Sequence, residues 1–379
     1  MQIKLLGSFL YLGSSMENKK INVGILFGGK SAEHEISLRS AKNVIEAIDK
    51  KKYQPVLIGI DKGGKWLFNE ETSLLLNTDD VNAMQLNDQS DQVALVPQSE
   101  GKISNLSRAD FHKSIDVVFP ILHGPFGEDG TIQGLLKLAD VPFVGAGVLG
   151  SAVGMDKDIM KRLLRDAGLP IGKFITLELE DKIPPYEEIV ELLGETCFVK
   201  PANLGSSVGI NKATTAEEYQ AAVKEAFLYD NKIIIEEFID GREIECAILG
   251  NENPKASVPG EITFNHNFYS YEAKYLDDQG YQLEIPVQLP EEITASIQEI
   301  ALRTFKVLAC KGFARVDVFL TADQRILVNE INTIPGFTKI SMYPKLWEAS
   351  GISYPDLIDQ LIQLAIQEHQ RDKRLRTSK

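Results

Sequence analysis

The stretch from Gly312 to Gly336, GFARVDVFLTADQRILVNEINTIPG, constrains the fold most. Two short strand patterns flank a connection of about four residues, a common length for a hairpin. Side chains alternate between the faces of a strand, so Arg315 and Asp317 share one face and apolar residues fill the other. The second strand is expected to carry on one face Ile326, Val328, Glu330 and Asn332. With a loop at 322–325, Asp317 lies opposite Glu330, and Arg315 lies opposite Asn332.

Facing carboxylates repel each other, so a cation is expected between Asp317 and Glu330. Carboxylate and amide oxygens are hard ligands, which suit Mg²⁺ with retained waters and substrate phosphates. An exposed face with ordinary charges would carry the same pair of carboxylates. The apolar reverse face and the abrupt stop at Pro335 and Gly336 favour the metal site instead.

Composition excludes several classes of protein. A chain of 379 residues is long enough for two or three domains. The formal net charge of -14 argues against nonspecific binding of nucleic acid, and no apolar stretch is long enough to span a bilayer. Three scattered cysteines, Cys197, Cys246 and Cys310, lie in apolar patterns and are expected to be buried thiols in a reducing cytoplasm.

The first part of the chain has the pattern of an α/β sheet. Apolar runs at 21–27, 56–60 and 115–121 read as strands of an open, mostly parallel sheet. Ligands bind beyond the carboxyl ends of such strands, where the Gly28 turn and His123 lie. Later segments at 243–249 and 257–262 alternate as antiparallel strands, and a long helix is expected at about 291–308.

Five further segments contain chemistry-bearing residues: GGKSAEHEIS at 28–37, HGPFGEDGTIQG at 123–134, MDK at 155–157, KPANLGSSVG at 200–209 and YEAKY at 271–275. With the hairpin, they resemble the D-alanine–D-alanine ligases, a family of ATP-grasp enzymes, from about Ile21 to the last helix. The resemblance implies an N-terminal open parallel α/β sheet domain followed by a two-part ATP-grasp fold with antiparallel sheets. It divides the chain into a non-family extension at 1–16, an N-terminal α/β substrate domain at 17–147, a central ATP-grasp subdomain at 148–240 and a C-terminal subdomain with the metal site and lid at 241–379.

The same resemblance assigns site residues. The implied catalytic residues are Glu33, His123, Ser206, Tyr275, Arg315 and Gly336. ATP is expected on Lys157, Lys200, Ser207, Glu236, Phe238, Ile239, Glu243 and Lys274. The substrate contacts are Glu33, His123, Lys274, Arg315, Gly336 and Ser341. Two Mg²⁺ or Mn²⁺ ions are expected on Asp317, Glu330 and Asn332.

The implied reaction is the ATP-dependent joining of two D-alanines through an acyl phosphate, for peptidoglycan precursor synthesis. A cytoplasmic homodimer without nucleic-acid or membrane partners is expected. Three alternatives stay open. Residues 24–31, GILFGGKS, match the phosphate-loop pattern of nucleotide switches, although the first glycine falls inside a strand pattern. A D-alanine–D-lactate ligase is disfavoured by Tyr275, since ester-forming relatives tend to lack tyrosine there. An inactive binding module is disfavoured because metal, lysine and oxyanion residues occur together.

A closing lid is predicted between Ile262 and Pro286, a long segment with weak strand or helix period. Several tyrosines surround Lys274, which is the only trypsin target between Lys255 and Arg303. A lid would exclude water from a hydrolysable acyl phosphate. Trypsin is therefore expected to cut quickly after Lys274 in the free protein and slowly with magnesium, nucleotide and D-alanine bound together. An unchanged cutting rate at saturating ligands would contradict the lid.

Overall fold

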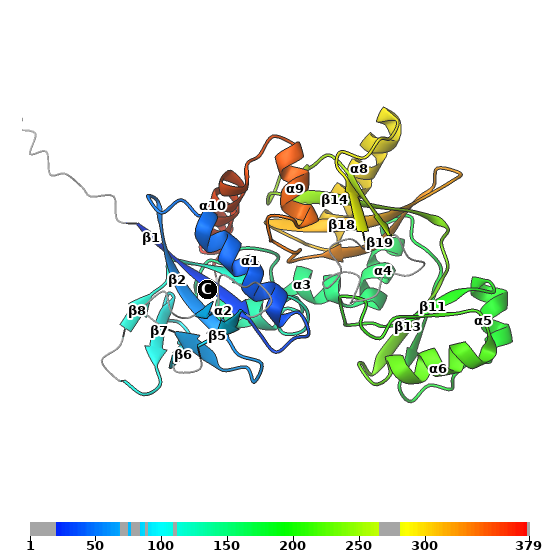
Figure 1. The fold of residues 1–379 in the computed structure, drawn as a ribbon, viewed down its shortest axis with the longest axis horizontal. Coiled ribbons are helices and arrows are strands. Elements are labelled where there is room, and N and C mark those ends of the chain that lie inside the picture. The colour runs from blue at the N-terminus through cyan, green and yellow to red at the C-terminus, as the bar shows by residue number, and fades with distance from the viewer. Residues whose placement is uncertain are drawn as a thin grey trace, which may run out of the picture.

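The computed structural model describes residues 20–68, 75–76, 84–87, 90–108, 112–264 and 281–376. They form sheets of seven, four and six strands, together with a two-stranded ribbon of β4 (Leu75–Leu76) and β5 (Gln85–Leu86). The N-terminal sheet and the four-stranded sheet lie at opposite ends of the molecule (Figure 1). The expected N-terminal extension, Lys274 and Tyr275 lie outside the described residues.

The N-terminal sheet is parallel only at one end, in the order β2, β1, β9. These strands are β1 (Ile21–Gly28), β2 (Tyr53–Ile60) and β9 (Val117–Ile121). An antiparallel extension follows from β3 (Trp66–Phe68), β6 (Asp91–Leu95), β7 (Lys102–Asn105) and β8 (His112–Ser114). The expectation of a mostly parallel sheet is therefore wrong for this extension. A tight turn at 61–65 joins β2 to β3 and leaves no room for a crossover helix.

Three helices accompany the N-terminal sheet: α1 (His34–Ala47), α2 (Thr131–Leu138) and α3 (Val148–Met155). The second sheet is antiparallel throughout, with β10 (Phe174–Glu178), β13 (Lys232–Glu237), β11 (Cys197–Pro201) and β12 (Asn211–Ala213) in that order. Helices α5 (Tyr186–Leu193) and α6 (Ala216–Ala226) share a buried core with it. Helix α4 (Lys157–Asp166) follows α3 and begins where Asp156 caps it.

The third sheet contains the hairpin. Its order is β17 (Tyr281–Glu284), β16 (Gly260–Phe264), β14 (Gly241–Leu249), β18 (Phe313–Thr321) and β19 (Ile326–Asn332), and β15 (Lys255–Ala256) pairs with β14. Helix α8 (Glu291–Val307) covers its apolar face. The last helices are α9 (Met342–Ala349) and α10 (Tyr354–Asp372).

The hairpin register confirms that Asp317 faces Glu330 and that Arg315 faces Asn332. The expected face of β19 is wrong for Ile326 and Val328. Val318 pairs with Val328 and Asp317 pairs with Glu330, so Asn329 is an extra, bulged residue. The bulge turns Val328 to the apolar face, where it packs in one core with Val318. Glu330 and Asn332 therefore keep the polar face, although Ile326 and Val328 do not share it.

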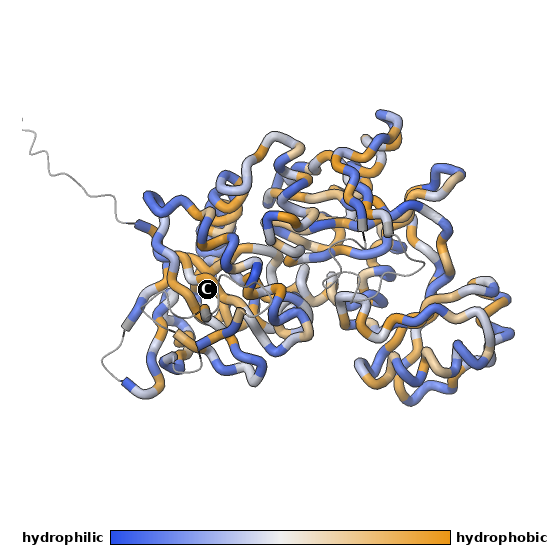
Figure 2. Tube along the Cα trace, in the orientation of Figure 1, coloured by the Kyte–Doolittle hydropathy of each residue, from blue (hydrophilic) through white to orange (hydrophobic). Residues whose placement is uncertain are grey.

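The C-terminal helices return to the N-terminal sheet. One hydrophobic core contains residues from β1 and α1 together with others from β18, α9 and α10. At its edge the Tyr53 hydroxyl donates to Asp359 at 2.8 Å. Orange, hydrophobic stretches follow the inner strands of this region, whereas blue stretches lie on its outer loops (Figure 2). Among the described helices, none combines the length and the apolar character that a membrane span requires. All three cysteines are buried, as expected.

Candidate active site

Three adjacent strands place a row of carboxylates across the polar face of the third sheet. On β14, Glu245 pairs with Asp317 of β18, which in turn pairs with Glu330 of β19. Neighbouring strands lie about 4.8 Å apart, so the row gathers three like charges in a small space. Glu245 did not emerge from the sequence, because the partner strand of β18 could not be read from the hairpin alone.

Arg315 neutralises part of this row. Its guanidinium forms two hydrogen bonds of 2.7 Å to the Asp317 carboxylate, and its Nε lies 2.8 Å from Glu245 Oε2. Burial alone would lower the pKa of Arg315, but Asp317 and Glu245 raise it well above its ordinary value. The Asn332 amide donates to Asp317 Oδ2 at 2.9 Å. Arg315 is therefore a permanent cation fixed beside the predicted metal ligands.

The donor set fits the metal that the fold implies. Asp317, Glu330 and Asn332 supply hard oxygen atoms from facing positions of one hairpin. Within the described ranges, no group of three or more His, Cys, Asp or Glu side chains is arranged to hold a metal ion by itself. Magnesium ordinarily uses only one or two carboxylates and completes its coordination with water and substrate phosphate, so this set suits it.

Two predicted nucleotide residues belong to a buried ion-pair chain. Lys200, at the end of β11, contacts Glu236 Oε2 on β13, and Lys161 Nζ of α4 lies 2.7 Å from Glu236 Oε1. Burial raises the pKa of Glu236, but Lys161 and Lys200 outweigh it and lower that pKa to about 2. Lys161 was missed in the sequence. Its position one helical turn after Lys157 was the available signal, because residues four apart share a helix face.

Lys157 joins this group to the loop at 202–210. It begins α4, is buried, and donates from Nζ to the Leu204 carbonyl at 2.5 Å. Burial lowers the pKa of Lys157, while the charge of Glu330 acts in the opposite direction. In the same loop Ser206 and Ser207 have φ values of 54° and 60°. Such left-handed conformations are uncommon for serine and are concentrated at binding loops.

Glu33 lies at a junction of three segments. It is buried at the start of α1. A Cβ built on Gly124 would lie 3.1 Å from Glu33 Oε2, and one on Gly205 would lie 3.8 Å away. The structure therefore brings Glu33 to the loop that contains Ser206. The phosphate-loop alternative fails here, because Gly24 lies within β1 against Ile115.

His123 and Glu128 connect the N-terminal sheet to the end of β19. His123 Nδ1 lies 3.1 Å from the Ile334 carbonyl, and burial lowers the pKa of this histidine. Glu128 accepts hydrogen bonds from the N–H groups of Gly124 at 2.7 Å and Ile334 at 3.1 Å. Burial and then the charge of Glu33 raise the pKa of Glu128 to about 8. Glu128 was also missed in the sequence, although it belongs to the segment that His123 begins.

The remaining predicted residues lie around this centre. A Cβ on Gly336 would lie 3.1 Å from the hydroxyl of Ser341, which itself accepts from the Thr338 N–H at 3.0 Å. Phe238 and Ile239 form the connection between β13 and β14, and the Phe238 ring lies 6.2 Å from that of Phe198. Glu243 stands two residues before Glu245 on β14, and therefore on the same face.

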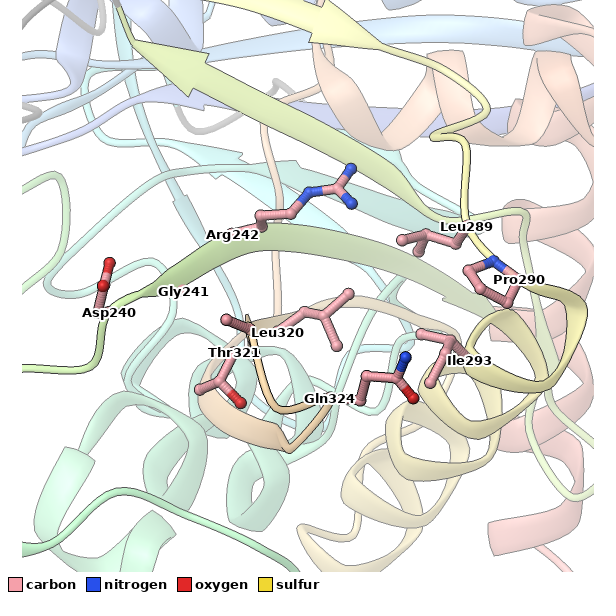
Figure 3. Close-up of a pocket in the computed structure, with 10 residues that line it drawn as sticks. Asp240, Gly241, Arg242, Leu289, Pro290, Ile293, Leu320, Thr321 and Gln324 are labelled. Carbon is pink, nitrogen blue, oxygen red and sulfur yellow. The ribbon is translucent and has the colours of Figure 1, made fainter.

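A separate pocket of about 490 Å³ lies where this connection enters β14. Apolar side chains of Leu289, Ile293 and Leu320 gather there beside the start of α8, and Arg242 extends past them (Figure 3). The Arg242 guanidinium is held by Glu261 at 2.6 and 2.8 Å. The described residues that line this pocket include none of the predicted site residues, so the pocket is not assigned to the chemistry.

The paired antiparallel sheets, with lysines on one and a carboxylate row on the other, define an ATP-grasp enzyme. Family profiles described as D-ala D-ala ligase N-terminus and C-terminus match residues 22–146 and 163–363. A D-alanine–D-alanine ligase of Shouchella clausii is 56% identical over 361 residues, covering 95% of this chain and 98% of that protein. The chain belongs to the D-alanine–D-alanine ligase family.

Solved structures agree with this assignment. The D-alanine-D-alanine ligase from Coxiella burnetii superimposes with a TM-score of 0.82 at 41% identity, covering 94% of this chain and 96% of that chain. The VanG D-Ala:D-Ser ligase from Enterococcus faecalis gives a TM-score of 0.80 at 35% identity, covering 92% of this chain and 100% of that chain. Relatives of one fold are thus named for different second substrates.

The ion pairs of Glu236 with Lys161 and Lys200 predict that the free energy of unfolding depends on pH in the acidic range. The pKa of Glu236 falls from 4.5 to about 2 on folding, so its ionised form stabilises the protein above pH 4.5. That contribution is lost as the pH falls towards 2. Glu236→Gln removes the proton uptake, so its unfolding free energy should fall less steeply with decreasing pH, by up to about 1.4 kcal/mol per pH unit.

Denaturant unfolding between pH 4.5 and 2.5 measures the two slopes around the ordinary and lowered pKa values of Glu236. Glu217→Gln removes an exposed carboxylate from α6 and serves as the control, with the wild-type slope expected. Equal slopes for the wild type and Glu236→Gln would show that Glu236 is not held ionised by its lysines.

Proposed function

We propose that the protein joins two D-alanines to D-alanyl-D-alanine with ATP, through an acyl phosphate, for peptidoglycan precursor synthesis. One observation supports this most directly. Buried Lys157 begins α4 directly after α3, and Gly154 of α3 packs against Ile331 and Thr333, so the lysine group lies close to the end of β19 that contains Glu330. Cations that suit phosphates beside carboxylates that suit magnesium are the arrangement that phosphoryl transfer needs.

The nucleotide is proposed to lie between the second and third sheets. Lys157 and Lys200 bind its phosphates, together with the loop at Ser207. The adenine and ribose are proposed to bind at the β13–β14 connection and the strand residues beside it: Glu236, Phe238, Ile239 and Glu243. Many relatives carry lysine where this chain has Glu237, whose side chain instead accepts from the Lys173 N–H at 2.8 Å. The adenine contact is therefore expected to use the backbone.

Asp317, Glu330 and Asn332 are proposed to hold two Mg²⁺ or Mn²⁺ ions. When bound, these ions neutralise the charge on the phosphate oxygens and align the transferring group. Arg315 can release part of Asp317 to a metal because Glu245 also holds its guanidinium at 2.8 Å. The protein supplies positioning and electrostatic stabilisation rather than a covalent intermediate of its own.

The first D-alanine is proposed to place its ammonium on Glu33 and its carboxylate near His123. The second D-alanine is assigned to Ser341 and Lys274, while Ser206 and Tyr275 complete the network that begins at Glu33. Arg315 and the Gly336 N–H are proposed to stabilise the tetrahedral oxyanion. Loss of one such donor typically costs about 3 kcal/mol of barrier. The protein is proposed to act as a cytoplasmic homodimer without membrane or nucleic-acid partners. Its chain is proposed to divide into three parts, at 17–147, 148–240 and 241–379.

Phosphate release from ATP, measured with a panel of amino and hydroxy acids, tests the reaction itself. D-alanine alone should support release, and the product should be the dipeptide. D-lactate and D-serine should compete poorly as second substrates near pH 7, and L-alanine should be inactive. Equal yields of ester and peptide would favour the D-lactate alternative, whereas no release with any acid would contradict the ligase.

Glu330→Gln tests the metal assignment. The substitution keeps the shape of the side chain but removes one charge from the row, so turnover at ordinary magnesium should fall by about 100-fold, equivalent to about 3 kcal/mol. The melting temperature should change little. Asp323→Asn is the matched control, since Asp323 lies in the loop of the same hairpin and bonds only within it, to Thr321 and Arg325. Unchanged turnover for Glu330→Gln would remove Glu330 from the metal site.

A further inference from the structure

Lys161 is a buried cation for which neither the sequence patterns nor the proposed reaction has a use. Its side chain is 3% exposed, and its ammonium lies 2.7 Å from Glu236 Oε1. A buried charge is costly unless it is paired, so this lysine requires Glu236. Glu236, however, already contacts Lys200 through its other oxygen. One carboxylate therefore serves two ammonium groups.

The charge balance among Lys161, Glu236 and Lys200 explains why a second lysine is present. Glu236 and Lys200 alone would form a neutral buried pair, with the Lys200 ammonium committed to its own carboxylate. Lys161 adds one positive charge and takes one oxygen, which weakens the hold of Glu236 on Lys200. Electrostatic energies are large in a buried environment of low dielectric constant, so the surplus positive charge attracts a nearby polyanion strongly.

The surroundings of Lys161 keep its ion pair dry. The Lys161 ammonium lies 6.0 Å from the centroid of the Phe174 ring, and the Arg165 guanidinium lies 5.8 Å from the same centroid. Phe174 is the register partner of Glu236 across β10 and β13. The ring therefore stands beside the carboxylate, where it limits the access of water to the pair.

We propose that Lys161 is a positioning residue for the nucleotide: by holding one oxygen of Glu236, it leaves Lys200 free to bind the ATP phosphates. This inference rests on the proposed function, because it assumes that Lys200 binds phosphate. Lys161 itself does not touch the nucleotide. Its effect reaches the phosphates only through the charge of Glu236. The inference therefore requires an energetic coupling between Lys161 and Glu236 in nucleotide binding.

A double-mutant cycle on the full-length protein measures that coupling, with MgADP binding as the readout. Lys161→Met should weaken MgADP binding by about tenfold in the wild-type background, which is typical of close buried charge pairs. In the Glu236→Gln background the same substitution should cost less than about twofold, because no carboxylate remains to capture Lys200. Equal losses in both backgrounds would overturn the inference.

Lys232→Met is the matched control for a purely structural role. Lys232 also ties α4 to β13, with Nζ 2.5 Å from Asp156 and 3.6 Å from Asp158, but it is not paired with Glu236. Its loss should lower the melting temperature and leave MgADP affinity unchanged. If Lys232→Met weakens MgADP as much as Lys161→Met does, helix docking rather than charge explains the effect, and the inference is wrong.

Two further variants separate the remaining outcomes. If Lys161→Met does not fold, Lys161→Gln removes the charge but keeps a polar side chain, and a smaller loss of affinity in the same direction is expected. Lys200→Ala is measured alongside. Weak binding by Lys200→Ala with normal binding by the Lys161 variants overturns this inference alone. Normal binding by Lys200→Ala overturns the phosphate assignment of the proposed function as well.

Discussion

The site depends on holding like charges together in a protein interior. Glu245, Asp317 and Glu330 stand in one row on adjacent strands, where they repel one another unless a cation intervenes. Arg315 supplies that cation from within the sheet and contacts two members of the row at once. The arrangement around Glu236 is the reverse, because one carboxylate lies between two lysine ammonium groups. Each half of the site is thus partly neutralised before any ligand binds, and each keeps a charge that a ligand can use.

The N-terminal sheet and the hairpin sheet are joined through the backbone of Ile334. Its carbonyl lies 3.1 Å from His123, and its N–H donates to Glu128, so the end of the hairpin is fixed from the N-terminal sheet. The shared core of β1, β18 and α10 supports the same junction from behind. The distance between the carboxylate row and the segment of His123 is therefore set by packing and two hydrogen bonds.

Local patterns predicted the elements that contain the site, and register explains where they failed. The facing of Asp317 and Glu330 was correct because a longer loop and the bulge at Asn329 compensate for each other. A period of two cannot reveal a bulge, so the side of Val328 was wrong. Glu245 and Lys161 depend on which strands and helices become neighbours across distant parts of the chain. That information resides in tertiary packing, and the antiparallel extension of the first sheet escaped prediction for the same reason.

The missed residues share a physical property that makes them informative. Glu245 and Lys161 are charged groups in buried positions, which burial alone disfavours. In most of a protein, buried positions are occupied by residues that favour stability. Exceptions to this rule are concentrated at functional sites. The left-handed serines at 206 and 207 belong to the same pattern. In this chain the buried charges and the strained loop belong to the elements where ATP and the metal ions are proposed to bind, so the cost in stability is concentrated there.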